Sequence, residues 1–145
     1  AVVEYLCEDF IIDLKQLDTS GVELARGLEM ILEQLVAVVT SPRHVSFYRL
    51  VVNGSAHVPQ VGQTWYEHGP KFWHQLIANL LQEQRQRGAI ATDASTSEVP
   101  AILFDALFSH LTTRTVMLGQ TCTAKAFQPM IQELIALVMR RLQVA

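Results

Sequence analysis

The spacing of the apolar residues constrains this chain more than any other feature of its sequence. From Val3, Leu6 and Phe10 onward, apolar residues recur three and four positions apart, as they do on one face of an α-helix. Only residues 45–52 have the β-branched and aromatic composition that favours a strand. A lone strand would have no partner, because nothing else in the chain alternates with period two. The sequence therefore predicts an all-α fold, a bundle of about six helices.

Turn and capping residues predict where the first helices begin and end. The first helix is expected to end near Asp18, and Ser20 with Glu23 has the spacing of a capping box at the start of the second. Ser41 and Pro42 have the residue types of an N-cap and a first helical position, so they predict the start of the third helix.

Proline and glycine predict the limits of the later helices. A long fourth helix is expected from Pro59 to Gly88, with a kink at Pro70, whose ring crowds the preceding turn and which has no amide hydrogen to donate. The fifth helix is expected to follow Ser97 as its N-cap. The sixth is expected over about residues 125–142.

Composition and charge limit the class of protein. The chain has 145 residues, of which 50% are hydrophobic and 17% charged, which suits one domain with its own core. No apolar run approaches the roughly 20 residues that span a bilayer, and no signal peptide is visible, so a cytoplasmic protein is expected. The formal net charge is −3 and the 11 basic residues are scattered, so this chain alone is not expected to bind nucleic acid.

Catalytic and metal-binding motifs are missing from the sequence. None of the five histidines lies four residues from another, and there is no nucleotide-binding or nucleophile motif. We therefore expect no enzymatic activity, no catalytic residue, no cofactor and no metal site. Cys7 and Cys122 are expected to be free thiols in a reducing cytoplasm, with a thiol redox sensor as the alternative.

Aromatic side chains gather around the expected kink at Pro70. Trp and Tyr combine a bulky ring with a polar tip, which suits a partly wet cavity, although plain core packing is the alternative. The pattern predicts a pocket for a small, mostly apolar molecule, with Trp65 and Trp73 as its leading walls. The candidate ligand-binding residues are Tyr48, Trp65, Tyr66, Phe72, Trp73, Phe104, Phe108 and His110.

The last two helices, within residues 97–145, carry more apolar faces than a helix at the edge of a monomer needs. One face of each would close the monomer core, and the other would meet a second copy of the chain. Spacing alone does not show which face is outward. The candidate interface residues of this homodimer are Phe104, Phe108, Leu111, Thr115, Phe127, Ile131, Leu134 and Val138.

Two stretches resemble the C-terminal domain of TetR-family transcriptional regulators. In residues 49–59 an arginine leads an apolar run, and a proline ten residues later opens a long helix. Residues 65–70 then supply an aromatic–tyrosine pair and a Gly-Pro at the family's spacing. Residues 87–90, before a polar loop and a helix that ends at Gly119, are also similar.

The resemblance implies the effector-binding and dimerising half of a bacterial regulator, usually a repressor. Such proteins read DNA through an N-terminal helix-turn-helix, and this chain begins inside a helical pattern without Met, which suggests that it is cut from a longer protein. Residues 1–18 look like the helix that connects the two parts. A small effector would release the protein from DNA. The alternative is a helical protein–protein interaction module without a ligand.

Overall fold

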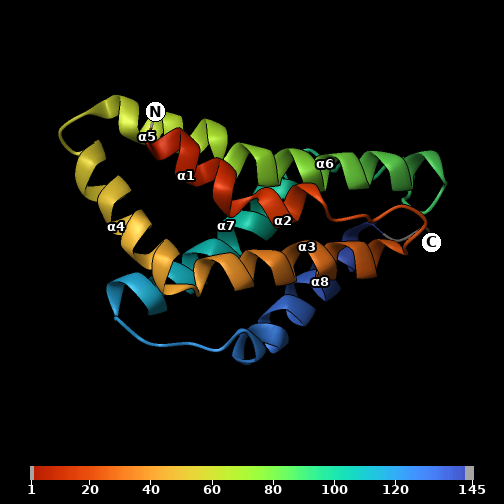
Figure 1. Ribbon diagram of the computed structural model, residues 1–145. Helices are drawn as coiled ribbons and strands as arrows, with labels where there is room; N and C mark the ends of the chain where they lie inside the picture. The colour runs from red at the N-terminus through yellow and green to blue at the C-terminus, as the bar shows by residue number, and fades with distance from the viewer. Residues whose placement is uncertain (1, 143–145) are drawn as a thin grey trace.

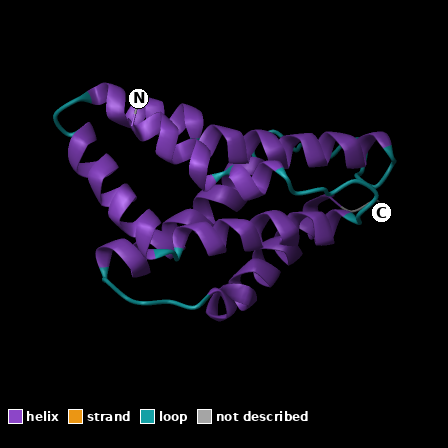
Figure 2. Ribbon diagram, viewed as in Figure 1, coloured by secondary structure: helices purple, strands orange, loops and turns teal. Residues whose placement is uncertain are grey.

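The computed structural model describes residues 2–142, and within them it contains helices and no strand (Figures 1 and 2). The predicted all-α fold is confirmed. Residue 1 and residues 143–145, which the predicted connecting helix and dimer-forming segment include, lie outside the described residues. The helices are α1 (Val2–Phe10), α2 (Ile12–Lys15), α3 (Leu24–Val39), α4 (Pro42–Ser55), α5 (Pro59–His68), α6 (Pro70–Gln86), α7 (Val99–Thr112), the π-helical η1 (Thr113–Met117), the 3-10 helix η2 (Ala124–Phe127) and α8 (Gln128–Leu142).

Several predicted helix boundaries are confirmed. Ser41 is the N-cap of α4, because its hydroxyl accepts a hydrogen bond from the backbone amide of His44 at 3.2 Å. Pro59 begins α5. Gly88 follows the end of α6 with a φ of +77°, the left-handed conformation that glycine adopts most easily.

Other boundaries differ from the prediction. The Ser20–Glu23 capping box is wrong, since the amide of Ser20 is held by Asp18 Oδ1 at 2.9 Å, and Glu23 is itself the N-cap position of α3. The first predicted helix is broken into α1 and α2 at Ile11. The fifth begins at Val99 with Glu98 at the cap, one residue later than Ser97 would place it.

The predicted kink at Pro70 is a break between two helices. The long fourth helix of the prediction is α5 and α6, which are separated by Gly69. In Figure 1, α3, α4 and the α5–α6 pair outline a triangle in which α4 joins the end of α3 to the start of α5. α7 lies behind this triangle and packs against both α3 and α6, and α8 packs against α3 and α7.

The buried apolar side chains form two separate clusters. The main core joins α2, α3, α6, α7 and α8, with Leu28, Ile77 and Leu107 among its fully buried members. A minor cluster around Cys7 and Phe47 joins α1, α4 and α5. The two clusters meet where the rings of the aromatic residues gather, and we call this boundary the seam.

Candidate functional site

A small cavity lies in the seam between the two clusters. Its volume is about 30 Å³, which accommodates a water molecule and is far below the several hundred Å³ of a pocket for a drug-sized ligand. The lining residues come from both clusters: Cys7, Phe10, Ile11, Leu35, Val38, Val39, His44, Phe47, Trp65, Gly69, Pro70, Trp73, Phe104 and Phe108.

An open groove of about 530 Å³ lies on the other side of the same aromatic rings. It is a surface depression between the α5–α6 break and the outer side of α7, and it is large enough for a small organic molecule. Its lining residues are Tyr48, Trp65, Tyr66, Pro70, His74, Ala101, Phe104, Asp105, Phe108 and Ser109. Four of these, Trp65, Pro70, Phe104 and Phe108, also line the cavity.

Phe108 is the central ring of the layer that divides the cavity from the groove. Its ring stacks on Phe104 with centroids 5.3 Å apart and on Tyr48 with centroids 5.2 Å apart. Trp65 lies 6.0 Å from Phe108 and 5.6 Å from Tyr48. Phe108 is only partly buried, and with Trp65 and Phe104 it stands between the groove and the inner cavity.

The break at Gly69 brings the α5 end of this layer close to α1. A Cβ atom at Gly69 would lie 3.0 Å from the carbonyl oxygen of Trp65 and 3.8 Å from the sulfur of Cys7. An alanine here would therefore crowd the backbone of Trp65, whereas its contact with Cys7 would be an ordinary one. The Gly-Pro pair both ends α5 and sets the position of Trp65 at the wall of the site.

The polar groups of the site stand at its two ends. At the groove mouth, His74 Nε2 is 3.1 Å from Asp105 Oδ1, and the His74 ring is edge-on to Phe104. At the inner end His44 lines the cavity, and burial lowers the pKa of its imidazole to about 4. His44 is therefore neutral near pH 7.

The structure brings together most of the predicted ligand-binding residues. Tyr48, Trp65, Tyr66, Phe104 and Phe108 line the groove, and Trp73 lines the cavity. Sequence reasoning missed the polar lining residues. The position of His44 at the site could have been predicted, because it lies one helical turn before Tyr48 and so shares the same face of α4.

Two predicted residues lie outside the site. The ring of Phe72 is covered by the ammonium group of Lys15, which lies 5.8 Å from the ring centroid. His110 is on another face of α7, where its ring meets Phe127 edge-on at 5.9 Å. A helix turns neighbouring residues onto different faces, so Phe72 and His110 do not join the residues that line the groove and the cavity.

Burial corrects the predicted dimer interface. Leu111 and Ile131 are 0% exposed, and Thr115 and Phe127 are also buried, so these four residues belong to the core of one chain and offer no surface to a second. The outward apolar residues of the last two helices are Ile102 and Leu137, which are 52% and 54% exposed. Of the remaining candidates, Phe104, Leu134 and Val138 are also buried in the core of one chain. Phe108 is partly buried and lines the cavity and the groove of the aromatic site.

Ile102 and Leu137 line a groove of about 360 Å³ between α7 and α8. Val138 forms part of the same lining, although its side chain is buried. The polar residues Glu98 and Arg141 lie at this groove too. An apolar centre with charged residues at its edge is the arrangement that protein interfaces commonly have.

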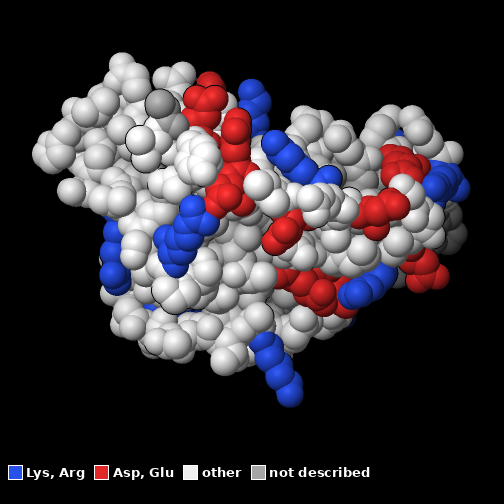
Figure 3. Space-filling view, in the orientation of Figure 1, with Lys and Arg blue, Asp and Glu red and all other residues white. Residues whose placement is uncertain are grey.

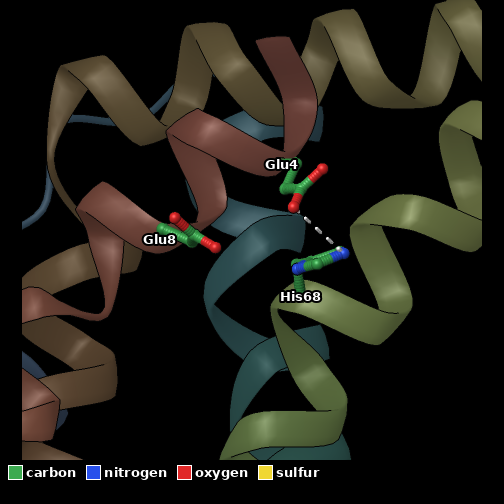
Figure 4. A group of neighbouring side chains, drawn as sticks. All are labelled: Glu4, Glu8 and His68. Carbon is green, nitrogen blue, oxygen red and sulfur yellow. Dashed lines mark ion pairs between the residues drawn. The ribbon is translucent and has the colours of Figure 1, made fainter. Parts of the chain in front are cut away.

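A cluster of Glu4, Glu8 and His68 lies where α1 meets α5 (Figure 4). The two carboxylates are one turn apart on α1, and His68 Nε2 is 3.9 Å from Glu4 Oε1. The three candidate ligand atoms lie within 4.8 Å of one another, and carboxylate and imidazole groups are ligands of Zn²⁺. Within residues 2–142 this is the one group that could hold a metal ion. The contact between His68 and Glu4 across α1 and α5 also accounts for their proximity.

Charged side chains are distributed unevenly over the surface. Figure 3 shows acidic residues gathered over α1, α2 and α3, whereas Lys and Arg stand apart from one another on the same face. That face therefore presents no continuous basic surface of the kind that binds DNA. None of the described helices is long and apolar enough to cross a membrane.

The comparison with protein families identifies the class. The family model described as AefR-like transcriptional repressor, C-terminal domain, matches residues 26–143. The chain belongs to this family of TetR-type C-terminal domains, and the resemblance found in its sequence is confirmed. Such domains are parts of transcriptional regulators, which are generally not enzymes. The searches of curated proteins and of solved structures found no match.

Proposed function

We propose that this chain is the effector-binding and dimerising domain of a TetR-type repressor, and that its effector binds in the groove beside Gly69. The observation that carries the proposal is the pair of spaces on either side of Phe108, a groove of about 530 Å³ and a cavity of about 30 Å³. Their lining is mostly apolar and rich in aromatic rings, which suits a small, mostly apolar molecule. Family membership supports a regulatory domain of this class.

The seam gives the domain a means of responding to its effector. α1 packs on α4 and α5, and an ion pair between Asp9 and Arg43 ties it to α4. A ligand that enters between Trp65 and Phe108 would separate the minor cluster from the main core. α1 would then move with α4 and α5 relative to α7 and α8.

In the whole protein, α1 connects this domain to an N-terminal helix-turn-helix that recognises DNA. Two such DNA-reading parts must match the spacing of two half-sites. A displacement of α1 in each protomer changes that spacing, so the effector releases the protein from its operator. The protein acts in the bacterial cytoplasm, and this domain makes no DNA contact of its own.

The dimer is formed by the outward faces of α7 and α8. Ile102 and Leu137 form its apolar centre, and Glu98 and Arg141 lie at its edge. A two-fold axis brings the same helices of the partner onto this face, which gives four helices from two chains. A stable interface of this kind buries more than about 1,200 Å² in total.

Thermal unfolding of the domain with a series of small aromatic compounds tests the ligand-binding part of this proposal. A compound present at about 100 times its Kd should stabilise the folded domain by about 2.7 kcal/mol. Trp65→Ala should abolish that stabilisation, whereas Phe72→Ala, outside the groove, should retain it. A domain that no compound stabilises, and that instead binds a protein through the same groove, would be the interaction module that is the alternative.

A further inference from the structure

The imidazole of His44 has an unsatisfied polar atom inside the seam. The residue is 5% exposed, and its Nδ1 is buried without a hydrogen-bond partner among the described residues. Its ring neighbours are the aromatic residues Phe10, Phe47, Tyr48 and Phe108, with centroids 5.2 to 6.2 Å away. Folded proteins rarely leave a buried polar atom unpaired, because its lost hydration is not replaced. A partner from outside the chain would satisfy it.

Phe108 is one of the side chains that lie between His44 and the open groove. Its ring is edge-on to His44, with centroids 6.2 Å apart and planes at 88°, and it lines both the cavity and the groove. The cavity itself accommodates only a molecule the size of water. Rotation of this partly buried ring would join the two spaces and place His44 at the inner end of one pocket.

The charges of the lining decide which ligands the joined pocket accepts. Neither the cavity nor the groove has a Lys or Arg among its lining residues, and Asp105 is the one carboxylate. Burial keeps His44 neutral near pH 7. An anionic ligand would lose its hydration without gaining a positive partner, which is costly in an apolar site.

We propose that His44 is the hydrogen-bonding anchor of the effector site, and that the effector is an uncharged, flat molecule with a hydroxyl group at its inner end. Its apolar rings lie among Trp65, Phe104 and Phe108 in the groove, and its hydroxyl reaches the imidazole of His44. This inference rests on the proposed function and adds to it the chemical class of the ligand.

Three probes that share one ring system separate the contribution of the hydroxyl group from those of the rings and of a negative charge. Naphthol, methylnaphthalene and naphthoate, all substituted at the same ring position, are titrated into the domain at neutral pH in a calorimeter. The domain should bind naphthol about tenfold more tightly than methylnaphthalene, since one added hydrogen bond contributes about that much. Naphthoate should bind most weakly.

Variants of His44 assign the preference to one side chain. His44→Phe keeps a ring of similar size and should bind naphthol and methylnaphthalene equally, whereas His44→Gln keeps a hydrogen-bonding group and should retain the preference for naphthol. His57→Phe, an exposed histidine outside the site, is the matched control and should behave as the wild type.

Two results would overturn the inference while leaving the proposed function intact. One is a naphthol preference that persists in His44→Phe, and the other is tightest binding of naphthoate. If none of the three probes binds the wild-type domain, both the anchor and the proposed effector site are contradicted.

Discussion

The rings of Tyr48 and Phe108 stack across the seam, with centroids 5.2 Å apart and planes inclined by 28°. Tyr48 belongs to α4 on one side, and Phe108 belongs to α7 on the other. A stacked aromatic pair contributes about 0.5–1.5 kcal/mol beyond the area it buries. The stacking interactions that close the seam are therefore modest in strength. A flat ligand that enters the seam would replace them with equivalent stacking on its own rings.

Removing the ring of Phe108 should open the pocket. Phe108→Ala removes the central ring of the layer between the groove and the cavity, so naphthol should associate faster than with the wild type. The variant should lose about 2 kcal/mol or more of unfolding free energy, because a partly buried ring is deleted. Stopped-flow binding and urea unfolding measure the two effects.

Phe72→Ala is the matched control for that prediction, since Phe72 is also partly buried and lies outside the site. It should lose stability without a change in the association rate. Equal association rates for wild type and Phe108→Ala would show that this ring does not control entry.

The buried imidazole should make the stability of the domain depend on pH. Burial lowers the pKa of His44 from its ordinary 6.5 to about 4. Between about pH 6.5 and pH 4, His44 is protonated in the unfolded chain but not in the folded protein. It therefore lowers the free energy of unfolding progressively as the pH falls through this range, and below about pH 4 the effect no longer grows. Relative to His44→Phe, the wild type should lose about 3 kcal/mol between about pH 7 and about pH 4.

Urea unfolding of the two proteins at several pH values measures this difference directly. The comparison removes the contributions of all other groups, because both proteins contain them. Parallel stability curves for wild type and His44→Phe would mean that His44 titrates at the same pH in the folded and unfolded states.

A charge in the outward face of the last two helices should dissociate the dimer. Leu137→Glu places a carboxylate in the proposed apolar centre, where dimerisation would strip it of water, while sparing the monomer core because Leu137 is 54% exposed. Light scattering should give the mass of one chain for this variant and of two chains for the wild type.

Leu50→Glu is the control for the dimer prediction. Leu50 is an equally apolar residue, 68% exposed on α4, and its substitution should leave the dimer unchanged. A wild-type domain with the mass of a single chain would refute the proposed interface, as would a dimer that Leu50→Glu disrupts and Leu137→Glu does not.

The two cysteines should differ in reactivity. Burial, with a smaller contribution from Glu8, raises the pKa of the Cys7 thiol to about 11, and the thiolate is the reactive form. In the folded domain Cys7 should therefore resist alkylation at neutral pH, while the partly exposed Cys122 reacts. Mass spectrometry of iodoacetamide-treated protein distinguishes them. Labelling of Cys7 at the same rate with and without denaturant would instead favour the thiol redox sensor.

Much of the fold follows from local signals in the sequence. Ser41 with Pro42 and the Gly69–Pro70 pair act within one or two turns, so their effects on helix boundaries are readable from the chain. The Ser20–Glu23 box failed because Asp18 competes for the amide of Ser20, a choice that spacing does not reveal.

The rotation of each helix was not predictable, because neighbouring helices determine it. Leu111 and Ile131 have the same apolar character as Ile102 and Leu137, yet the first pair is in the core and the second pair faces outward. The aromatic composition of the site was predictable. The unsatisfied Nδ1 of His44 was not, because only packing shows that it has no hydrogen-bond partner within residues 2–142.

The most direct test of the central claim uses the two tryptophans of the chain as reporters. Trp65 and Trp73 each give one indole resonance in a nitrogen–proton correlation spectrum, and Trp73→Phe assigns them. Both residues line the cavity and Trp65 also lines the groove, so naphthol should shift both resonances along a saturating curve with the Kd found by calorimetry. Two indole resonances that stay unmoved while naphthol saturates the domain would contradict an effector site at the seam.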